Sequence, residues 1–208
     1  LGYYMFEHFR HQIIRRATAV FGTLFNNIKI KRFDSSGNVS ETLTVPLRYA
    51  PKTKWYTRVF EGRQDTPEGP DYAIKSPSMG FELSSVLYDT SRKLNRMNRI
   101  RNGDISTGQI QGYVGTPYTM SYNLYVFANK TPDWSQIIEQ IIPNFNPTLN
   151  VPVKMIQNEA NGENIVHDIH ITLTSVAPDQ NMYGDFRERQ MYTWNLSFDM
   201  NISFYGKF

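Results

Sequence analysis

One alternating segment near the C-terminal end constrains the fold more than any other part of the chain. Its thirteen residues, Tyr192 to Phe204, alternate apolar and polar side chains. The apolar positions are Tyr192, Trp194, Leu196, Phe198, Met200, Ile202 and Phe204. A period of two predicts a β-strand with one buried and one solvated face. At ~3.3 Å per residue the strand spans roughly 43 Å, so we expect it to outgrow its own core, with one end approaching a neighbouring subunit.

Length and composition limit the classes of protein that fit. The 208 residues suit a single domain spanning residues 1–208. The absence of cysteine excludes disulfides, thiolate catalysis and cysteine-ligated metals. No apolar run approaches the ~20 residues of a membrane-spanning helix, and no signal peptide opens the sequence, so we expect no membrane partner and assembly in the cytoplasm. Because the sequence begins with Leu1 rather than Met, we also expect that N-terminal residues are missing.

Charge is distributed unevenly along the chain. Residues 1–63 hold eleven Lys or Arg against four acids, whereas residues 104–208 hold five against ten. A basic surface for nucleic acid is one interpretation. A second is a polar subunit whose basic side meets the acidic side of a neighbour. A third is that the two parts mix in space and cancel.

The N-terminal part predicts one helix and one hairpin. Residues 6–21 carry apolar side chains at three- and four-residue steps, which predicts a helix that ends at Gly22 or one turn later. Residues 28–33 and 39–49 are predicted strands, and the Asp-Ser-Ser-Gly-Asn segment at 34–38 supplies the hairpin turn.

The middle of the chain predicts two strands separated by a long loop. Residues 51–60 are a predicted short helix, and residues 61–72 form a polar loop rich in Pro and Gly that we expect to be flexible. Residues 81–88 and 118–126 are predicted strands. Between them, residues 90–116 lack periodicity, so we expect an irregular, flexible stretch.

A second helix is predicted from Thr131 to Ile142, with Thr131 as N-cap, Pro132 in the first helical position and Asp133 in the first turn. Strands at 151–155 and 165–176 follow. A turn at 178–185 then leads into the terminal strand.

The predicted elements indicate an α+β fold, a mainly antiparallel sheet with two or three helices packed on one face. The candidate core anchors come from the second helix and the long strand: Trp134, Ile138, Ile141, Trp194, Leu196 and Phe198.

Motifs for catalysis or metal binding are absent from the sequence. His8 and His11 do not form the His-Glu-x-x-His pattern. His167 and His170 fall on opposite faces of one predicted strand, so they cannot share a metal. Neither a Gly-x-Ser-x-Gly elbow nor a phosphate-binding glycine loop occurs. We therefore predict no catalytic, cofactor or metal site, and no enzymatic activity.

A basic cluster is the strongest electrostatic feature of the sequence. Five cations occur with no acid among them: Arg92, Lys93, Arg96, Arg99 and Arg101. Such a cluster suits contact with phosphates or with an acidic protein surface, or it keeps a loop solvated. No nucleic-acid-binding module accompanies it.

Several segments carry a resemblance to a known family. They occur in order along the chain: Arg15 to Arg32, Val45 to Lys52, Pro77 to Leu83, Tyr88 and Asp89, Lys93 to Asn95, Ile137 to Pro147, Arg187 to Arg189 and Trp194 to Phe198. Together they resemble the tail sheath stabiliser, or tail completion, proteins of contractile-tailed bacteriophages. The resemblance spans about residues 6–200 and is weaker at 61–72 and 102–116.

The resemblance implies a structural virion protein with no enzymatic activity and no cofactor. It implies a homohexameric ring that caps the tail tube and sheath at the head-proximal end and joins the neck. Tube, sheath and neck proteins are then the expected partners, and the paired Arg15 and Arg16 join the basic cluster as candidate contacts. DNA passing through the channel is a further, non-specific partner. The alternatives are another tube-terminating or baseplate component, and a basic nucleic-acid-binding module.

Overall fold

The computed structural model describes residues 8–54, 76–95, 97–102, 110–157, 164–179 and 192–206. Its main sheet has six strands in the order β3-β4-β7-β10-β9-β8. Their bounds are Leu47–Tyr49 for β3, Ser78–Tyr88 for β4, Thr116–Ala128 for β7, Thr148–Gln157 for β8, Asn164–Asp179 for β9 and Tyr192–Phe204 for β10. Every neighbouring pair is antiparallel except β3 with β4. The α+β prediction with a mainly antiparallel sheet is confirmed.

Strand β10 has the bounds that its alternation predicts, and it lies inside the sheet. It pairs with β7 along its whole length, from Tyr192 opposite Ala128 to Phe204 opposite Thr116. Its other edge pairs with β9. The strands predicted at 81–88, 118–126, 151–155 and 165–176 are all present, each longer than its pattern indicated.

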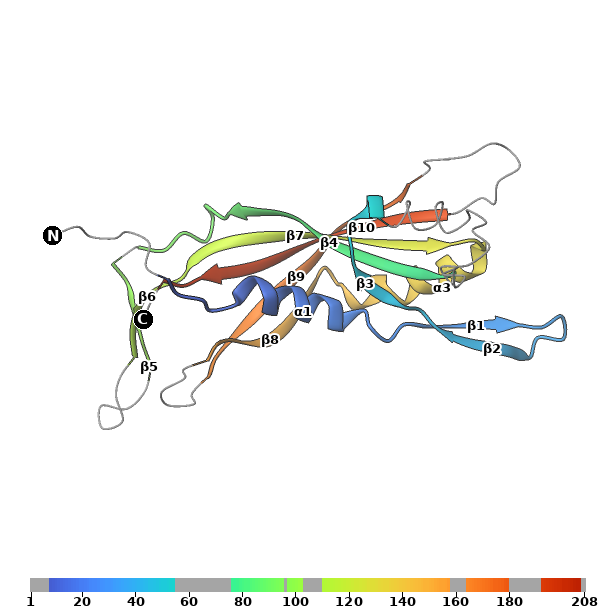
Figure 1. Cartoon of the computed structure of the whole chain (residues 1–208), viewed down its shortest axis with the longest axis horizontal. Coiled ribbons are helices and arrows are strands. Elements are labelled where there is room, and N and C mark those ends of the chain that lie inside the picture. Colours follow the sequence, from blue (N-terminus) through green and yellow to red (C-terminus); the bar gives the residue numbers. More distant parts are fainter. Residues whose placement is uncertain are drawn as a thin grey trace, which may run out of the picture.

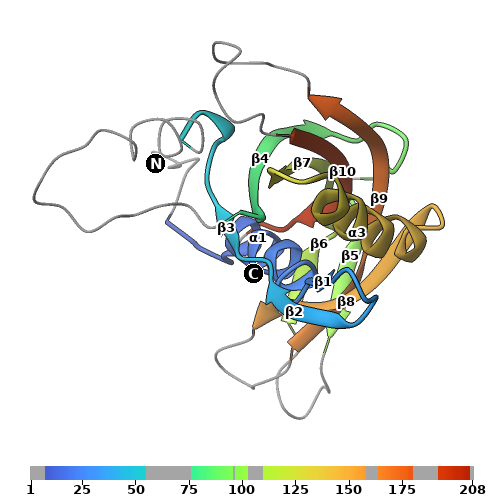
Figure 2. The same ribbon diagram turned by 90° about the vertical axis from the view of Figure 1, so that its right-hand side faces the viewer.

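Two helices cover one face of the main sheet. Helix α1 spans Ile13–Leu24, and helix α3 spans Thr131–Ile141 and continues into a 3-10 turn, η1, at Ile142–Asn144. The sheet curls around both helices, so their apolar sides share one core with its concave face (Figure 2). The predicted placement of helices on one face is confirmed.

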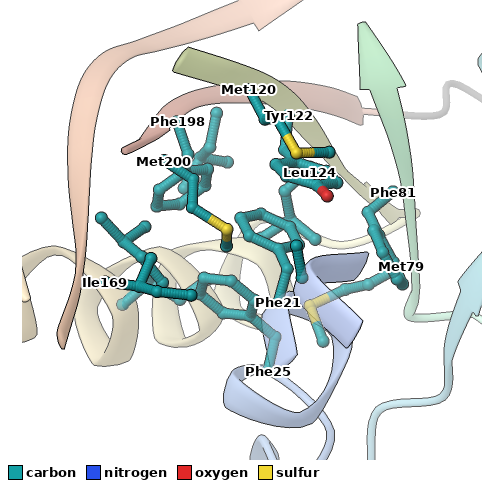
Figure 3. Close-up of a cluster of buried hydrophobic side chains, with 14 of the residues drawn as sticks. Phe21, Phe25, Met79, Phe81, Met120, Tyr122, Leu124, Ile169, Phe198 and Met200 are labelled. Carbon is teal, nitrogen blue, oxygen red and sulfur yellow. The ribbon is translucent and has the colours of Figure 1, made fainter. Parts of the chain in front are cut away.

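Phe21 of α1 lies at the centre of this core (Figure 3). Its ring stacks on Tyr122 of β7 with centroids 4.5 Å apart and meets Phe198 of β10 edge-on at 5.3 Å. Phe81 of β4 lies 5.4 Å away, and Phe25 one helical turn further lies 5.1 Å away. Offset and edge-on contacts of this kind add to the large area that buried aromatic rings remove from water.

Burial along β10 falls off toward both ends. Leu196, Phe198 and Met200 are fully buried, whereas Trp194 and Phe204 are half-buried and Tyr192 is 39% exposed. The strand therefore outgrows the core beneath it. Trp194 packs on Trp134 with ring centroids 4.7 Å apart. Ile138 and Ile141 are buried.

Helix α1 starts later than predicted and ends at Leu24, within the extension beyond Gly22 that the sequence left open. Residues 8–12 are not helical, because Gln12 has a left-handed backbone with φ of 55° that interrupts the helix before Ile13. The first two residues of the predicted helix lie outside the described residues. Gly22 lies inside the helix and not at its end. A Cβ atom there would lie 3.0 Å from the Phe81 ring, so glycine permits this close packing.

Helix α3 has the predicted composition but a shifted start. Thr131 is its first helical residue, and Lys130 occupies the N-cap position without a side-chain cap, so the predicted cap is wrong. Asp133 lies in the first turn as expected. The residue is only 2% exposed, and an ion pair with Arg32 compensates the buried carboxylate for the loss of water.

The predicted hairpin is present as β1, Lys29–Phe33, and β2, Val39–Thr44, which pair antiparallel. The predicted strand at 39–49 is broken after Thr44, because Val45 turns into the core and Pro46 has no N–H to donate. Strand β3 then runs parallel to β4. The hairpin β1–β2, here called the arm, projects from one end of the elongated molecule (Figure 1).

The region at 90–116 is not irregular throughout. Strands β5, Arg99–Asn102, and β6, Ile110–Tyr113, form a second hairpin. Each has only four residues, too short for periodicity to reveal. Of the predicted helix at 51–60, Lys52 to Lys54 are helical and the rest lies outside the described residues. The loop at 61–72 and the turn after Asp179 lie outside them too, and the start of that turn belongs to β9.

Replacement of the central ring tests this core. We expect Phe21→Ala to lower the free energy of unfolding by about 3–5 kcal/mol, because it removes contacts to four other rings and leaves a cavity. Ile14→Ala on the same helix is the matched control, since Ile14 is 47% exposed and its loss leaves no buried cavity. Chemical denaturation measures both. Equal effects of the two substitutions would contradict the central place of Phe21.

Candidate assembly surfaces

The basic cluster predicted from the sequence follows β4, and its members have different environments. Arg92 is half-buried; its Nε donates to Asp89 Oδ2 at 2.6 Å and its Nη2 to the Tyr118 carbonyl at 2.8 Å. These bonds fix the chain after β4 to the start of β7. The bonds to Arg92 and Ser91 hold the pKa of Asp89 well below its usual range.

The other members of the cluster lie beyond this fixed point. Lys93 and Arg99 are exposed, and the Arg99 guanidinium lies 5.7 Å from the centre of the Tyr113 ring. Arg101 belongs to β5. Arg96 lies outside the described residues. Of the cluster members whose side chains the structure describes, Lys93 and Arg99 are therefore the exposed candidates for contact.

The paired arginines of α1 face different ways. Arg15 is exposed, and its nearest hydrogen bond is a long one of 3.4 Å to Gln12. Arg16 is half-buried and donates to the Lys154 carbonyl of β8 at 3.2 Å. Arg16 thus ties the helix to the sheet edge, whereas Arg15 is available to a partner.

Helix α3 holds the arm in place through hydrogen bonds between its side chains and the backbone of β1. The amide of Gln136 accepts from the Lys31 N–H at 2.9 Å and donates to the Lys31 carbonyl at 3.0 Å. Gln140 donates to the Lys29 carbonyl at 2.9 Å. These side chains bond the N–H and C=O groups on the outer edge of β1, as the backbone of a neighbouring strand would. A two-stranded hairpin is marginal alone, so this support determines the position of the arm.

An ion pair adds to this support. Arg32 Nη2 donates to Asp133 Oδ2 at 2.8 Å. The hydrogen bond that Arg32 donates to Asp133 raises the pKa of the Arg32 guanidinium above its ordinary value, which favours its charged form. Ile30 next to it is fully buried. The base of the arm is therefore fixed to α3 on one side and to the core on the other.

The tip of the arm is exposed and apolar. Phe33 and Val39 face each other across the hairpin and are 61% and 50% exposed. Asp34 and Glu41 are exposed beside them. Large apolar groups held away from any core mark contact sites.

The opposite end of the molecule carries a second exposed apolar surface. Strand β3 pairs with β4 only from Met79 to Phe81. Within the described residues no strand pairs with that edge of β4 from Glu82 to Tyr88. The exposed apolar side chains at this end are Val86, Leu87, Tyr88, Leu94, Met97 and Tyr113. With Lys93 and Arg99 they form what we call the basic end.

The convex face of the main sheet is polar, as the alternation in β10 predicts. Ser121 donates to Asp199 at 2.7 Å, and Ser197 donates to Asn123 at 3.2 Å, each pair linking β7 with β10. Asn195 Oδ1 is buried there without a hydrogen-bond partner in the described structure. Toward one end of the same face, Tyr125 and Phe127 of β7 form a small apolar cluster with Ala50, separate from the main core. The polar character therefore belongs to the middle of this face.

The histidines act as local anchors. His11 Nε2 lies 2.8 Å from the Gly206 carbonyl, and His167 Nε2 lies 2.8 Å from the Tyr205 hydroxyl. Burial lowers the pKa of His167, which favours its neutral form. His170 instead contacts Asn150. In the described part of the chain, no three ligating side chains gather into a metal site.

Similarity to known proteins shows the class of protein to which this chain belongs. A family model described as the T4-like virus Myoviridae tail sheath stabiliser matches residues 8–208. The chain belongs to this family, and it is a structural protein of the phage tail and part of the virion. It is similar to the tail completion protein gp15 of Enterobacteria phage T4, with 30% identity over 199 residues, covering 95% of this chain and 72% of that protein. None of the described helices is long and apolar enough to cross a bilayer.

Loss of the ion pair tests how the arm is held. We expect Asp133→Ala to lower the free energy of unfolding by about 1–3 kcal/mol, because Arg32 loses its closest partner. Glu139→Ala is the matched control, since Glu139 is exposed on the same helix. Thermal denaturation measures both, and amide exchange of β1 should rise only in Asp133→Ala. An unchanged β1 would show that the ion pair does not hold the arm.

Proposed function

We propose that copies of this chain assemble into a hexameric ring that caps the tail tube and sheath at the head-proximal end and joins the tail to the neck. In this role the protein is structural and uses neither a catalytic site nor a cofactor. The ring number and the position on the tail rest on the family resemblance. The observation that carries the proposal is the family match across residues 8–208.

The shape and surface chemistry of the subunit support a ring. The elongated molecule carries one exposed apolar surface at the tip of the arm and a different one at the basic end (Figure 1). Identical subunits that join through two different surfaces make heterologous contacts, and such contacts close into rings when the rotation allows. The polar middle of the convex face can remain hydrated in such a ring.

The same family assignment also indicates which tail proteins this chain contacts along the tail axis. The relative in phage T4 is a tail completion protein by name. We propose that this chain likewise contacts tube and sheath proteins, with Arg15, Lys93 and Arg99 as candidate contacts because they are exposed. DNA in the channel is a non-specific partner in this proposal, through the same exposed cations.

Mass and location together test the proposal. We expect light scattering of the purified protein to give a mass six times that of one chain, and we expect the protein to bind added tail tubes. Gold labelling of isolated tails should mark the head-proximal end alone. A chain that stays monomeric and fails to bind tubes would overturn the proposal. Label at the distal end or along the tail would favour a baseplate or tube component instead.

A further inference from the structure

Of the strand edges that no described strand covers, two lie at opposite ends of the molecule, on β2 and on β4 (Figure 1). Strand β2 of the arm pairs with β1 on one side, and no described strand covers its other side. Its six residues are exposed except Leu43, which is half-buried. The second edge is β4 from Glu82 to Tyr88. The two edges have nearly equal length.

Such edges present free N–H and C=O groups that pair readily with another strand. Proteins that must stay separate protect an edge with proline, with inward charges or with a bulge. Strand β4 has a bulge between Leu83 and Ser85. Beyond it, residues 86–88 are Val, Leu and Tyr, without charge or proline. The end of β4 is therefore suited to pairing.

Both ends carry apolar surface, and the acids at the tip of the arm have the opposite charge to the cations of the basic end. The arm also carries Lys29, Lys31 and Arg32, and Arg32 pairs with Glu41 of its own arm at 3.5 Å. The arm tip combines exposed Phe33 and Val39 with acidic Asp34 and Glu41. The basic end combines its exposed apolar side chains with Lys93 and Arg99. Complementary charges set the register and orientation of such a contact, and the apolar groups supply buried area. A second copy of this chain therefore offers each end a matching partner.

We propose that β2 of one copy extends the main sheet of the next copy along β4, from Glu82 to Tyr88, with the arm tip packed on the basic end. This inference rests on the proposed ring and names the surface that builds it. Because each copy gives its arm at one end and accepts an arm at the other, the contact is heterologous. Gln136, Gln140 and Asp133 hold the arm before contact, so little conformational freedom is lost on binding.

Engineered disulfides between copies test this contact, because the chain has no cysteine of its own. Thr42→Cys is combined in turn with Val86→Cys and with Leu87→Cys; all three positions are exposed. Adjacent strand residues point to opposite faces, so one of the two pairs should place both thiols on the same face. Under mild oxidation of the full chain, we expect that pair to give a ladder of linked copies on a non-reducing gel. Either single-cysteine variant should give nothing beyond a dimer.

A matched control uses the opposite edge of the main sheet. Thr42→Cys with Ala177→Cys of β9 places the second thiol at another exposed edge position, and we expect no ladder. Light scattering of each variant, alone and with tail tubes, gives the number of copies independently. Suppose the protein assembles but neither β4 pair gives a ladder, or the control pair gives an equal ladder. Either result overturns the strand contact and leaves the proposed ring standing. Protein that stays monomeric in both conditions overturns the contact and the ring together.

Discussion

The pairing of β7 with β10 is the constraint on which the rest of the structure depends. Thirteen residues of β10 stand opposite thirteen of β7, and one face of each strand must be buried. Helix α1 covers the middle of that face with Phe21, and helix α3 covers one end with Ile137 and Ile141. Neither helix is long enough to cover both ends, so the sheet extends past its own core.

This excess length gives the subunit its two different ends. Where the core stops, the last residues of β4 carry exposed apolar side chains, and β3 covers only the first part of that strand. At the other end, α3 supports the arm through Gln136 and Gln140. The fold thus has a well-packed centre, whereas its peripheral strands leave edges and apolar side chains exposed. An assembling structural protein requires such exposed surfaces for contact with its neighbours.

Local patterning predicted the parts of this fold that have a strong period. Strand β10 has its predicted bounds, since alternation over thirteen residues leaves no other register for the buried face. The helix start at Ile13 was not predictable, because a left-handed backbone is uncommon for a residue such as Gln12 and leaves no periodic signal in the sequence. The sequence pattern missed the break in the strand at Val45 and Pro46, and it missed the short strands β5 and β6. Each of these features involves too few residues to show a period.

Sequence patterns located the candidate contact residues but not the environments of their side chains. Arg92 and Arg16 belong to the predicted basic sets, yet both make hydrogen bonds that hold their own subunit together. The arm and its supports were missed altogether. Arg32 and Asp133 are 101 residues apart, and Gln136 and Lys31 are 105 apart, so no local pattern links them. Asp133 in the first turn of a helix was explained by the helix dipole alone, although a buried ion pair determines its place.

Hydrogen–deuterium exchange on free and tail-assembled protein tests the central claim, that each subunit folds around β7 and β10 and leaves two edges for its neighbours. We expect the amides of β7 and β10 to be protected in both states. Those of β2 and of residues 82–88 in β4 should exchange quickly in the free chain and gain protection on assembly. Equal protection of these edges before and after assembly, or protection of β7 and β10 only after it, would contradict this account.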